Sequence, residues 1–209
     1  MEKEADDLVI GFDALLAASK SIPMTKRGLL QLIARVFDPL GLLSPLFVCL
    51  KCAFQYVCKS GIGWDESLPA EQLVTVQDWL KDLSKVGTIR FPRYCFASAL
   101  SEVRNVKLIG FSDASQSASG SVVYARAESR FGVHVNLLAA KSRIAPLKTQ
   151  SLPRLELLGC LTLANMSKLV SAALASAVCI ESRHYFSDSR TALCWIRNKE
   201  NRFKQFFEA

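Results

Sequence analysis

The sequence predicts an α/β fold in which a helical N-terminal segment precedes a mixed sheet with the element order β-β-β-α-β-α. Two observations lead to this prediction. Apolar residues recur at helical spacing between residues 29 and 83, whereas short apolar runs rich in β-branched and aromatic residues follow residue 105. The chain has 209 residues, 50% of them apolar and 22% charged, so it can bury a sizeable core and is not predominantly disordered.

Three helices are expected in the first half. The first covers residues 29–37 and stops before Pro39, because the residue preceding a proline avoids the α region. The second covers residues 45–59, with a proline at its first position, and ends before Gly61. The third covers residues 69–86, where apolar side chains share one face. Together they predict a helical segment.

The second half is expected to contain six elements. The first three strands lie so close in sequence that they favour an antiparallel meander. A long helix, a fourth strand and a short helix follow. The expected ranges are 106–111, 121–125, 133–137, 153–175, 184–187 and 191–198.

Three carboxylates stand out by their positions. Asp113 and Asp188 each follow an apolar strand, and Glu156 lies one turn into the long helix. The first and fourth strands, if adjacent, would bring the two aspartates together, and the first turns of the helix would add Glu156. Clustered carboxylates at strand ends suit Mg²⁺, and two such ions can promote phosphodiester hydrolysis.

Each of these acids also has an ordinary structural interpretation. Asp188 is suitably placed to cap the helix that follows it, and Asp113 to cap a turn with Ser115. Glu156 near a helix start is favourable for the helix dipole. The residues alone therefore leave open a metal site or a set of caps.

The formal net charge is +7, and the whole excess lies in residues 101–209, which indicates a polyanionic partner such as nucleic acid. The alternative is that these basic residues form an ordinary solvated surface with no polyanionic partner.

The cysteines and the N-terminus bear on the compartment. Seven cysteines, an odd number, and an acidic N-terminus predict an intracellular rather than a secreted protein. No apolar run is free enough of charged residues and prolines to predict a membrane partner. The spacing Cys49-x-x-Cys52 is interpreted as two core cysteines.

Several long motifs, in order, resemble BEL/Pao-type retrotransposon Pol polyproteins. They are TKRGLLQLIARVFDPLGLLSP (25–45), GWDESLP (63–69), FSDAS (111–115), AKSRIAPLK (140–148), SLPRLELL (151–158) and FSDSRTALCWIR (186–197). The resemblance implies an N-terminal extension (1–24), a helical segment like a reverse-transcriptase thumb and connection (25–100), and a ribonuclease H-like domain (105–209). In that family the segment is often grouped under a Pao peptidase heading, but the sequence has no aspartic-protease motif.

The resemblance makes Asp113, Glu156 and Asp188 the catalytic, metal-binding carboxylates, with two Mg²⁺ or Mn²⁺ ions in an intact site. It implies hydrolysis of RNA in RNA–DNA hybrids during reverse transcription, in a retroelement particle of the cytoplasm or in the nucleus. The remainder of a Pol polyprotein would be a partner. The basic residues expected to contact nucleic acid are Lys141, Arg143, Lys148, Arg154 and Arg190.

The same resemblance predicts a domain that is incomplete at its C-terminus. Such enzymes carry a fourth acid after a fifth strand, and Glu208 does not match that position. The Asp6-Asp7 pair also lacks the sequence context of a polymerase site. Enzymatic activity is therefore an open question, and two alternatives stand beside it: a non-catalytic nucleic-acid-binding remnant, and an unrelated structural α/β protein whose acids are caps.

Overall fold

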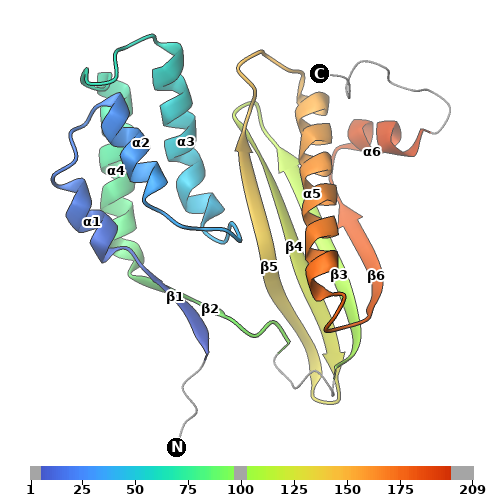
Figure 1. Cartoon of the computed structure of the whole chain (residues 1–209). Coiled ribbons are helices and arrows are strands. Elements are labelled where there is room, and N and C mark those ends of the chain that lie inside the picture. The colour runs from blue at the N-terminus through green and yellow to red at the C-terminus, as the bar shows by residue number, and fades with distance from the viewer. Residues whose placement is uncertain (1–5, 97–102, 199–209) are drawn as a thin grey trace, which may run out of the picture.

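Four helices and a small two-stranded sheet form the first half of the protein in the computed structural model, which describes residues 6–96 and 103–198 (Figure 1). We call this half the helical part. Its elements are β1 (Asp7–Gly11), α1 (Asp13–Ser19), α2 (Lys26–Ala34), α3 (Ser44–Lys59), α4 (Ala70–Val86) and β2 (Thr88–Pro92). The predicted second and third helices correspond to α3 and α4 to within one residue at each end.

Helix α2 differs from its predicted range. It begins earlier, because the side chain of Thr25 caps it by accepting a hydrogen bond from the N–H of Gly28. It also ends at Ala34, well before the proline. The carboxylate of Asp38 accepts hydrogen bonds from the N–H groups of Leu42 and Leu43, so it organises the turn into α3 instead of ending α2.

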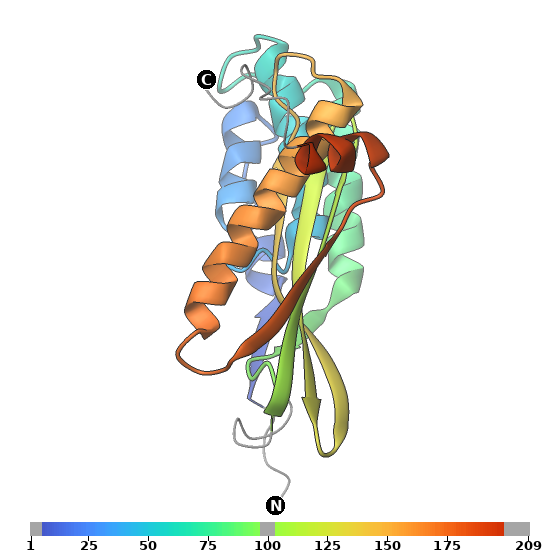
Figure 2. The ribbon, with the colours of Figure 1, turned by 90° about the vertical axis from the view of Figure 1, so that its right-hand side faces the viewer.

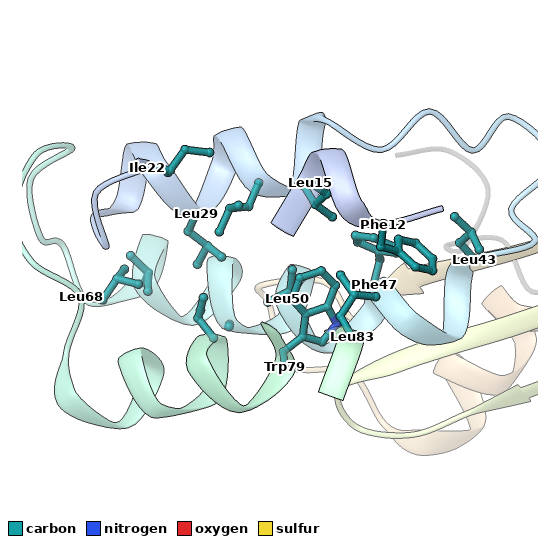
Figure 3. Close-up of a cluster of buried hydrophobic side chains, with 14 residues drawn as sticks. Phe12, Leu15, Ile22, Leu29, Leu43, Phe47, Leu50, Leu68, Trp79 and Leu83 are labelled. Atoms are coloured by element: carbon teal, nitrogen blue, oxygen red, sulfur yellow. The ribbon is translucent and has the colours of Figure 1, made fainter. Parts of the chain in front are cut away.

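The helical part has its own hydrophobic core, in which side chains from α1 to α4 meet (Figure 3). Leu50 and Val57 of α3 and Val76 of α4 are completely buried. Trp79 packs edge-on against Phe47, and its indole N–H donates to the carbonyl of Leu46 at 2.5 Å. Helical spacing of apolar residues therefore translates directly into one shared core.

The pairing of β1 with β2 has no counterpart among the predicted elements. The two strands run antiparallel with Val9 opposite Arg90, and they connect the start of the helical part to its end. Phe12 and Leu15, which follow β1, belong to the core of the helical part. Residues expected as an N-terminal extension thus contribute strand β1 and helix α1.

A four-stranded mixed sheet forms the second half, which we call the sheet part (Figures 1 and 2). Its strand order is β5-β4-β3-β6, with β3 antiparallel to β4 and parallel to β6. The predicted order β-β-β-α-β-α is confirmed. The elements are β3 (Val103–Ala114), β4 (Ala118–Ser129), β5 (Gly132–Ile144), α5 (Leu152–Leu174), β6 (Ile180–Phe186) and α6 (Arg190–Arg197).

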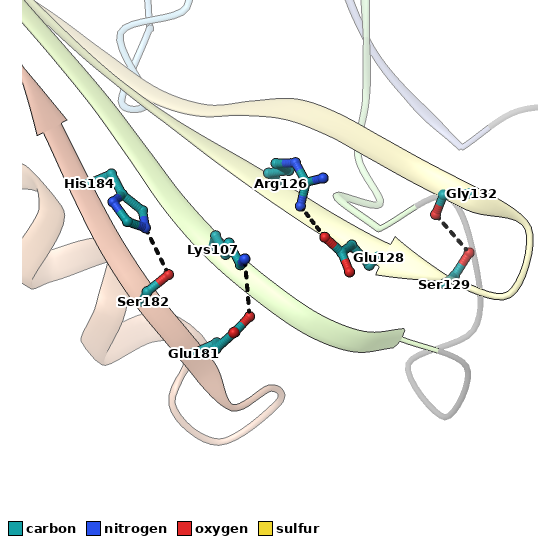
Figure 4. Close-up of polar contacts among 8 residues, drawn as sticks. All are labelled: Lys107, Arg126, Glu128, Ser129, Gly132, Glu181, Ser182 and His184. Atoms are coloured by element: carbon teal, nitrogen blue, oxygen red, sulfur yellow. Dashed lines mark hydrogen bonds and ion pairs between the residues drawn. The ribbon is translucent and has the colours of Figure 1, made fainter.

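The strands are longer than the apolar runs that predicted them. Polar side chains continue each strand beyond its apolar centre and pair with one another (Figure 4). Lys107 of β3 forms an ion pair with Glu181 of β6 at 3.6 Å, and Arg126 of β4 bonds to Glu128. The first pair joins neighbouring strands and the second lies along one strand. Cross-strand polar pairs such as the first stabilise sheet positions that carry no hydrophobic signal.

Helix α5 covers one face of the sheet (Figure 1). Its buried side includes Leu155, Glu156, Leu163 and Met166. Gly110 of β3 permits the close approach, because a Cβ there would lie 2.6 Å from a methyl group of Leu163. By length and composition α5 also resembles a membrane-spanning helix, but the sheet contacts identify it as the helix that completes the core of the sheet part.

The helical part meets the sheet part along β5, where α3 lies beside the sheet edge (Figure 1). The N–H of Ala140 donates to the carbonyl of Leu40 at 2.8 Å, and Gly41 packs directly on the carbonyl of Ala140.

On the sheet face opposite α5, Phe111 and Phe186 are stacked and about half exposed.

Candidate metal centre

Asp113, Glu156 and Asp188 come from three different elements and meet at one end of the sheet. Asp113 is the penultimate residue of β3, Asp188 follows β6 by two residues, and Glu156 lies on α5. One carboxylate oxygen from each residue lies within 4.8 Å of the others. Because β3 and β6 are parallel neighbours, their carboxyl ends bring the two aspartates together, as the sequence predicted.

Side-chain contacts hold α5 over these strand ends. The hydroxyl of Ser121 donates to the carbonyl of Gly159 at 3.0 Å, and the hydroxyl of Ser112 lies 3.5 Å from the sulfur of Cys160. Both serines are buried beneath the helix. The position of Glu156, one turn before Cys160, is therefore supported by contacts of α5 with β3 and β4.

The capping interpretations of the two aspartates do not match the structure. Ser189, not Asp188, caps α6 by accepting from the N–H of Ala192. Ser115, not Asp113, organises the β3–β4 turn by accepting from the N–H of Ala118 at 3.2 Å. Both aspartates are exposed, so their carboxylates remain available to a ligand.

Glu156 occupies an unusual electrostatic position. Only 7% of its surface is exposed, and its Oε2 atom is buried without a hydrogen-bond partner. Burial raises the pKa of Glu156, and the charges of Asp113 and Asp188 raise it further, while the backbone N–H of Ala114 acts in the opposite direction. An ionised carboxylate held here among like charges requires a cation.

A divalent metal ion matches these requirements. Among residues 6–96 and 103–198, no Lys or Arg forms an ion pair with any of the three acids. The donor set consists of carboxylate oxygens, which are the ligands that Mg²⁺ and Mn²⁺ prefer. The Oε2 atom of Glu156, which is buried without a hydrogen-bond partner, would gain a partner in a bound cation. The three residues can therefore hold a hard divalent cation.

A cleft of about 900 Å³ lies beside the carboxylates, between the sheet and α3. Asp113, Asp188 and Lys141 line it from the sheet part, and Pro45 and Val48 line it from the helical part. The contribution of the helical part was not predicted, because nothing local in residues 42–48 indicates that they lie near the carboxylates.

The five basic residues expected to contact nucleic acid are all exposed, and they come from several elements of the sheet part. Lys141 lines both the carboxylate cleft and a second cleft, which Arg143 also lines and which borders α5. Arg190 begins α6, two residues after Asp188, and Arg154 lies in the first turn of α5. Lys148 lies in the loop between β5 and α5.

The expectation for the cysteines of α3 is wrong. Cys49 is exposed and Cys52 is only partly buried, so neither belongs to the core. Helix α3 turns these residues away from its apolar side, which carries Leu50 and Ala53. Glu208, the acid that does not match the fourth position of the related enzymes, lies outside the described residues.

A parallel strand pair with a carboxylate beyond or at each carboxyl end, and a third on the helix that covers the sheet, defines an α/β domain with a candidate metal site. A family model described as the Pao retrotransposon-like RNaseH-like domain matches residues 25–189, and the chain belongs to this family. The match includes the helical part from α2 onward and all three carboxylates. The fold is accordingly ribonuclease H-like. No curated protein matches the chain.

Three solved structures of foamy viral protease-reverse transcriptase are similar to the chain at low identity. The complex with an RNA/DNA hybrid has 16% identity over 88% of this chain and a TM-score of 0.42. Two complexes with double-stranded DNA, one of them of the form termed dRH, have 14% and 15% identity over 90% and 91% and TM-scores of 0.44 and 0.45. The chain spans between 25% and 36% of the length of those proteins.

Proposed function

We propose that the protein hydrolyses the RNA strand of RNA–DNA hybrids in a metal-dependent reaction, as part of a retroelement Pol protein. The observation that carries this proposal is the approach of three carboxylates, from β3, α5 and the end of β6, to within 4.8 Å of one another. Membership of the Pao RNaseH-like family supports the choice of reaction.

Asp113, Glu156 and Asp188 would hold one or two Mg²⁺ or Mn²⁺ ions. Bound ions of this kind supply Lewis acidity, which makes water a stronger nucleophile and stabilises the leaving oxygen. In the overall reaction the water oxygen bonds to phosphorus, the bond from phosphorus to the 3′ oxygen breaks, and that oxygen gains a proton. The products are a 3′-hydroxyl and a 5′-phosphate, and no side chain forms a covalent intermediate.

The basic side chains are proposed to hold the hybrid through its phosphates. Lys141 is exposed in the carboxylate cleft, and Arg190 follows Asp188 closely in sequence. Both would contact phosphates of the hybrid close to the carboxylates. Such contacts give affinity that depends on salt but not on sequence.

A cleavage assay tests the proposal. The full chain is incubated with a hybrid whose RNA strand is labelled, with Mg²⁺ or with EDTA. We expect cleavage with Mg²⁺ only, and a rate loss of about 100-fold or more in Asp113→Asn, as for loss of a principal electrostatic stabiliser. Asp78→Asn, which removes an exposed carboxylate on α4, is the matched control and should cleave normally.

Cleavage that persists in Asp113→Asn would overturn the metal-site assignment. A chain that binds the hybrid with strong salt dependence and yet fails to cleave it would identify a non-catalytic nucleic-acid-binding protein instead. Absence of both activities would overturn the proposed function.

A further inference from the structure

Helix α3 of the helical part contacts the sheet part through residues at helical spacing. Val48, Cys52 and Gln55 follow one another at intervals of four and three residues, so they lie on one side of the helix. Val48 lines the carboxylate cleft. The thiol of Cys52 lies 3.8 Å from the carbonyl oxygen of Ser117, and the side-chain amide of Gln55 donates to the carbonyl of Ala145 at 2.6 Å.

The two carbonyl groups that α3 contacts belong to one hydrogen-bonded unit. The N–H of Ala145, just after β5, donates to the carbonyl of Ser117 at 2.8 Å. Ser117 lies in the β3–β4 turn, and Ala118 pairs with Ile144 at the start of β4. Gln55 therefore holds the end of β5, and the end of β5 holds the turn.

The β3–β4 turn begins two residues after Asp113. Ser115 closes it, because its N–H donates to the carbonyl of Ala118 at 2.8 Å while its hydroxyl oxygen accepts from the N–H groups of Ser117 and Ala118. The N–H of Ala114 donates to a carboxylate oxygen of Asp113 at 2.7 Å. A displacement of this turn would therefore reorient Asp113 relative to Glu156.

We propose that Gln55 is a positioning residue for the carboxylate centre, acting through Ala145 and Ser117 on the β3–β4 turn. The inference rests on the proposed function, since it concerns the affinity of the same centre for a divalent ion. In this proposal the helical part contributes to the centre through α3, which contacts the β3–β4 turn and the end of β5, although the three carboxylates all come from the sheet part.

The effect should be specific to the amide group of Gln55. The substitution Gln55→Met keeps a long unbranched side chain and removes the donor, which leaves the partly buried carbonyl of Ala145 without this partner. Gln77→Met makes the same chemical change at an exposed position of α4 and is the matched control. Partners that hydrogen-bond directly to a metal ligand alter metal affinity by about 10- to 100-fold, so the more distant contact of Gln55 is expected to act at the lower end of that range.

Two measurements on the full chain test the proposal. Titration with Mn²⁺ gives the dissociation constant of the parent, of both methionine variants and of Asp113→Asn. Amide hydrogen exchange, recorded without metal, reports the opening of residues 114–118. For Gln55→Met we expect a Mn²⁺ dissociation constant raised about tenfold and faster exchange in residues 114–118, with both unchanged in Gln77→Met.

The outcomes separate this inference from the proposed function. A parent that binds Mn²⁺ no better than Asp113→Asn would overturn the proposed function, and the positioning role with it. If the parent binds Mn²⁺ through Asp113 but Gln55→Met retains that affinity, only the positioning role is overturned, even where exchange is faster. Unchanged exchange in residues 114–118 of Gln55→Met would also overturn it.

Discussion

Glu156 is held in a position that costs stability when no metal is bound. Its carboxylate is buried, one oxygen lacks a partner, and two further carboxylates lie beside it. We predict that Glu156→Gln stabilises the metal-free protein at pH 7 by about 1 kcal/mol, within the usual range for an unsatisfied buried group. The melting temperature should rise by about 2–4 °C, and added Mg²⁺ should no longer raise it.

The pH dependence of this effect follows from the raised pKa of Glu156. Between the ordinary pKa of a glutamate and the raised pKa, the folded protein binds the proton that the unfolded chain has released. Stability of the metal-free protein therefore falls as pH rises through that interval. Melting curves from pH 4 upward should show this fall in the parent and a smaller one in Glu156→Gln. A lower melting temperature for the variant at pH 7 would contradict the prediction.

The three carboxylates could be selected from the sequence because each lies in a motif whose apolar neighbours form a strand or a helix. What local sequence could not supply is their separation, which depends on the parallel pairing of β3 with β6. The orphaned oxygen of Glu156 was equally hidden, since burial of a single atom depends on how α5 sits over Ser112 and Ser121. Gln55 carried no signal because its partner lies far along the chain.

The loop between α2 and α3 packs directly against β5, beside the contacts that α3 makes there. Gly41 has a φ of +70°, and a Cβ there would lie 1.8 Å from the carbonyl oxygen of Ala140. We predict that Gly41→Ala lowers the free energy of unfolding by about 2–4 kcal/mol, because it strains the backbone and pushes the loop away from β5. Urea unfolding followed by circular dichroism measures the change.

Gly61 provides the control for this prediction. It has a φ of +76°, but no atom lies within 4 Å of the place that a Cβ would occupy, so Gly61→Ala introduces backbone strain alone. Its expected cost is about 1–2 kcal/mol. Equal decreases in the two variants would show that the close approach of the loop to β5 contributes nothing to stability.

Elements with strong local signals were predicted better than those that depend on distant partners. Helices α3, α4 and α5 have proline near the start and apolar residues at helical spacing, so their bounds agree closely with expectation. Strands β1 and β2 are each five residues long and exist by pairing with one another across most of the helical part. Such non-local pairing has no signature in either segment alone.

At the scale of the whole molecule, the charge asymmetry predicts which part holds a polyanion. The excess of +7 lies in residues 101–209, and Lys141 and Arg190 are exposed near the carboxylates. We predict that hybrid binding weakens linearly with the logarithm of salt concentration. Replacing both residues by alanine should reduce that slope by about two, one for each phosphate that is no longer neutralised. Fluorescence anisotropy at several salt concentrations measures it.

The matched control removes the same charge from the helical part. Lys59 and Lys81 are exposed on α3 and α4. Their double alanine variant changes the net charge of the protein as much as the first pair does, so any effect of overall charge on long-range attraction is common to both. A direct contact with a phosphate, by contrast, releases a counterion and steepens the salt dependence only if the replaced residue makes that contact. Equal slopes in the two double variants would therefore attribute hybrid binding to net charge and not to the surface around the carboxylates.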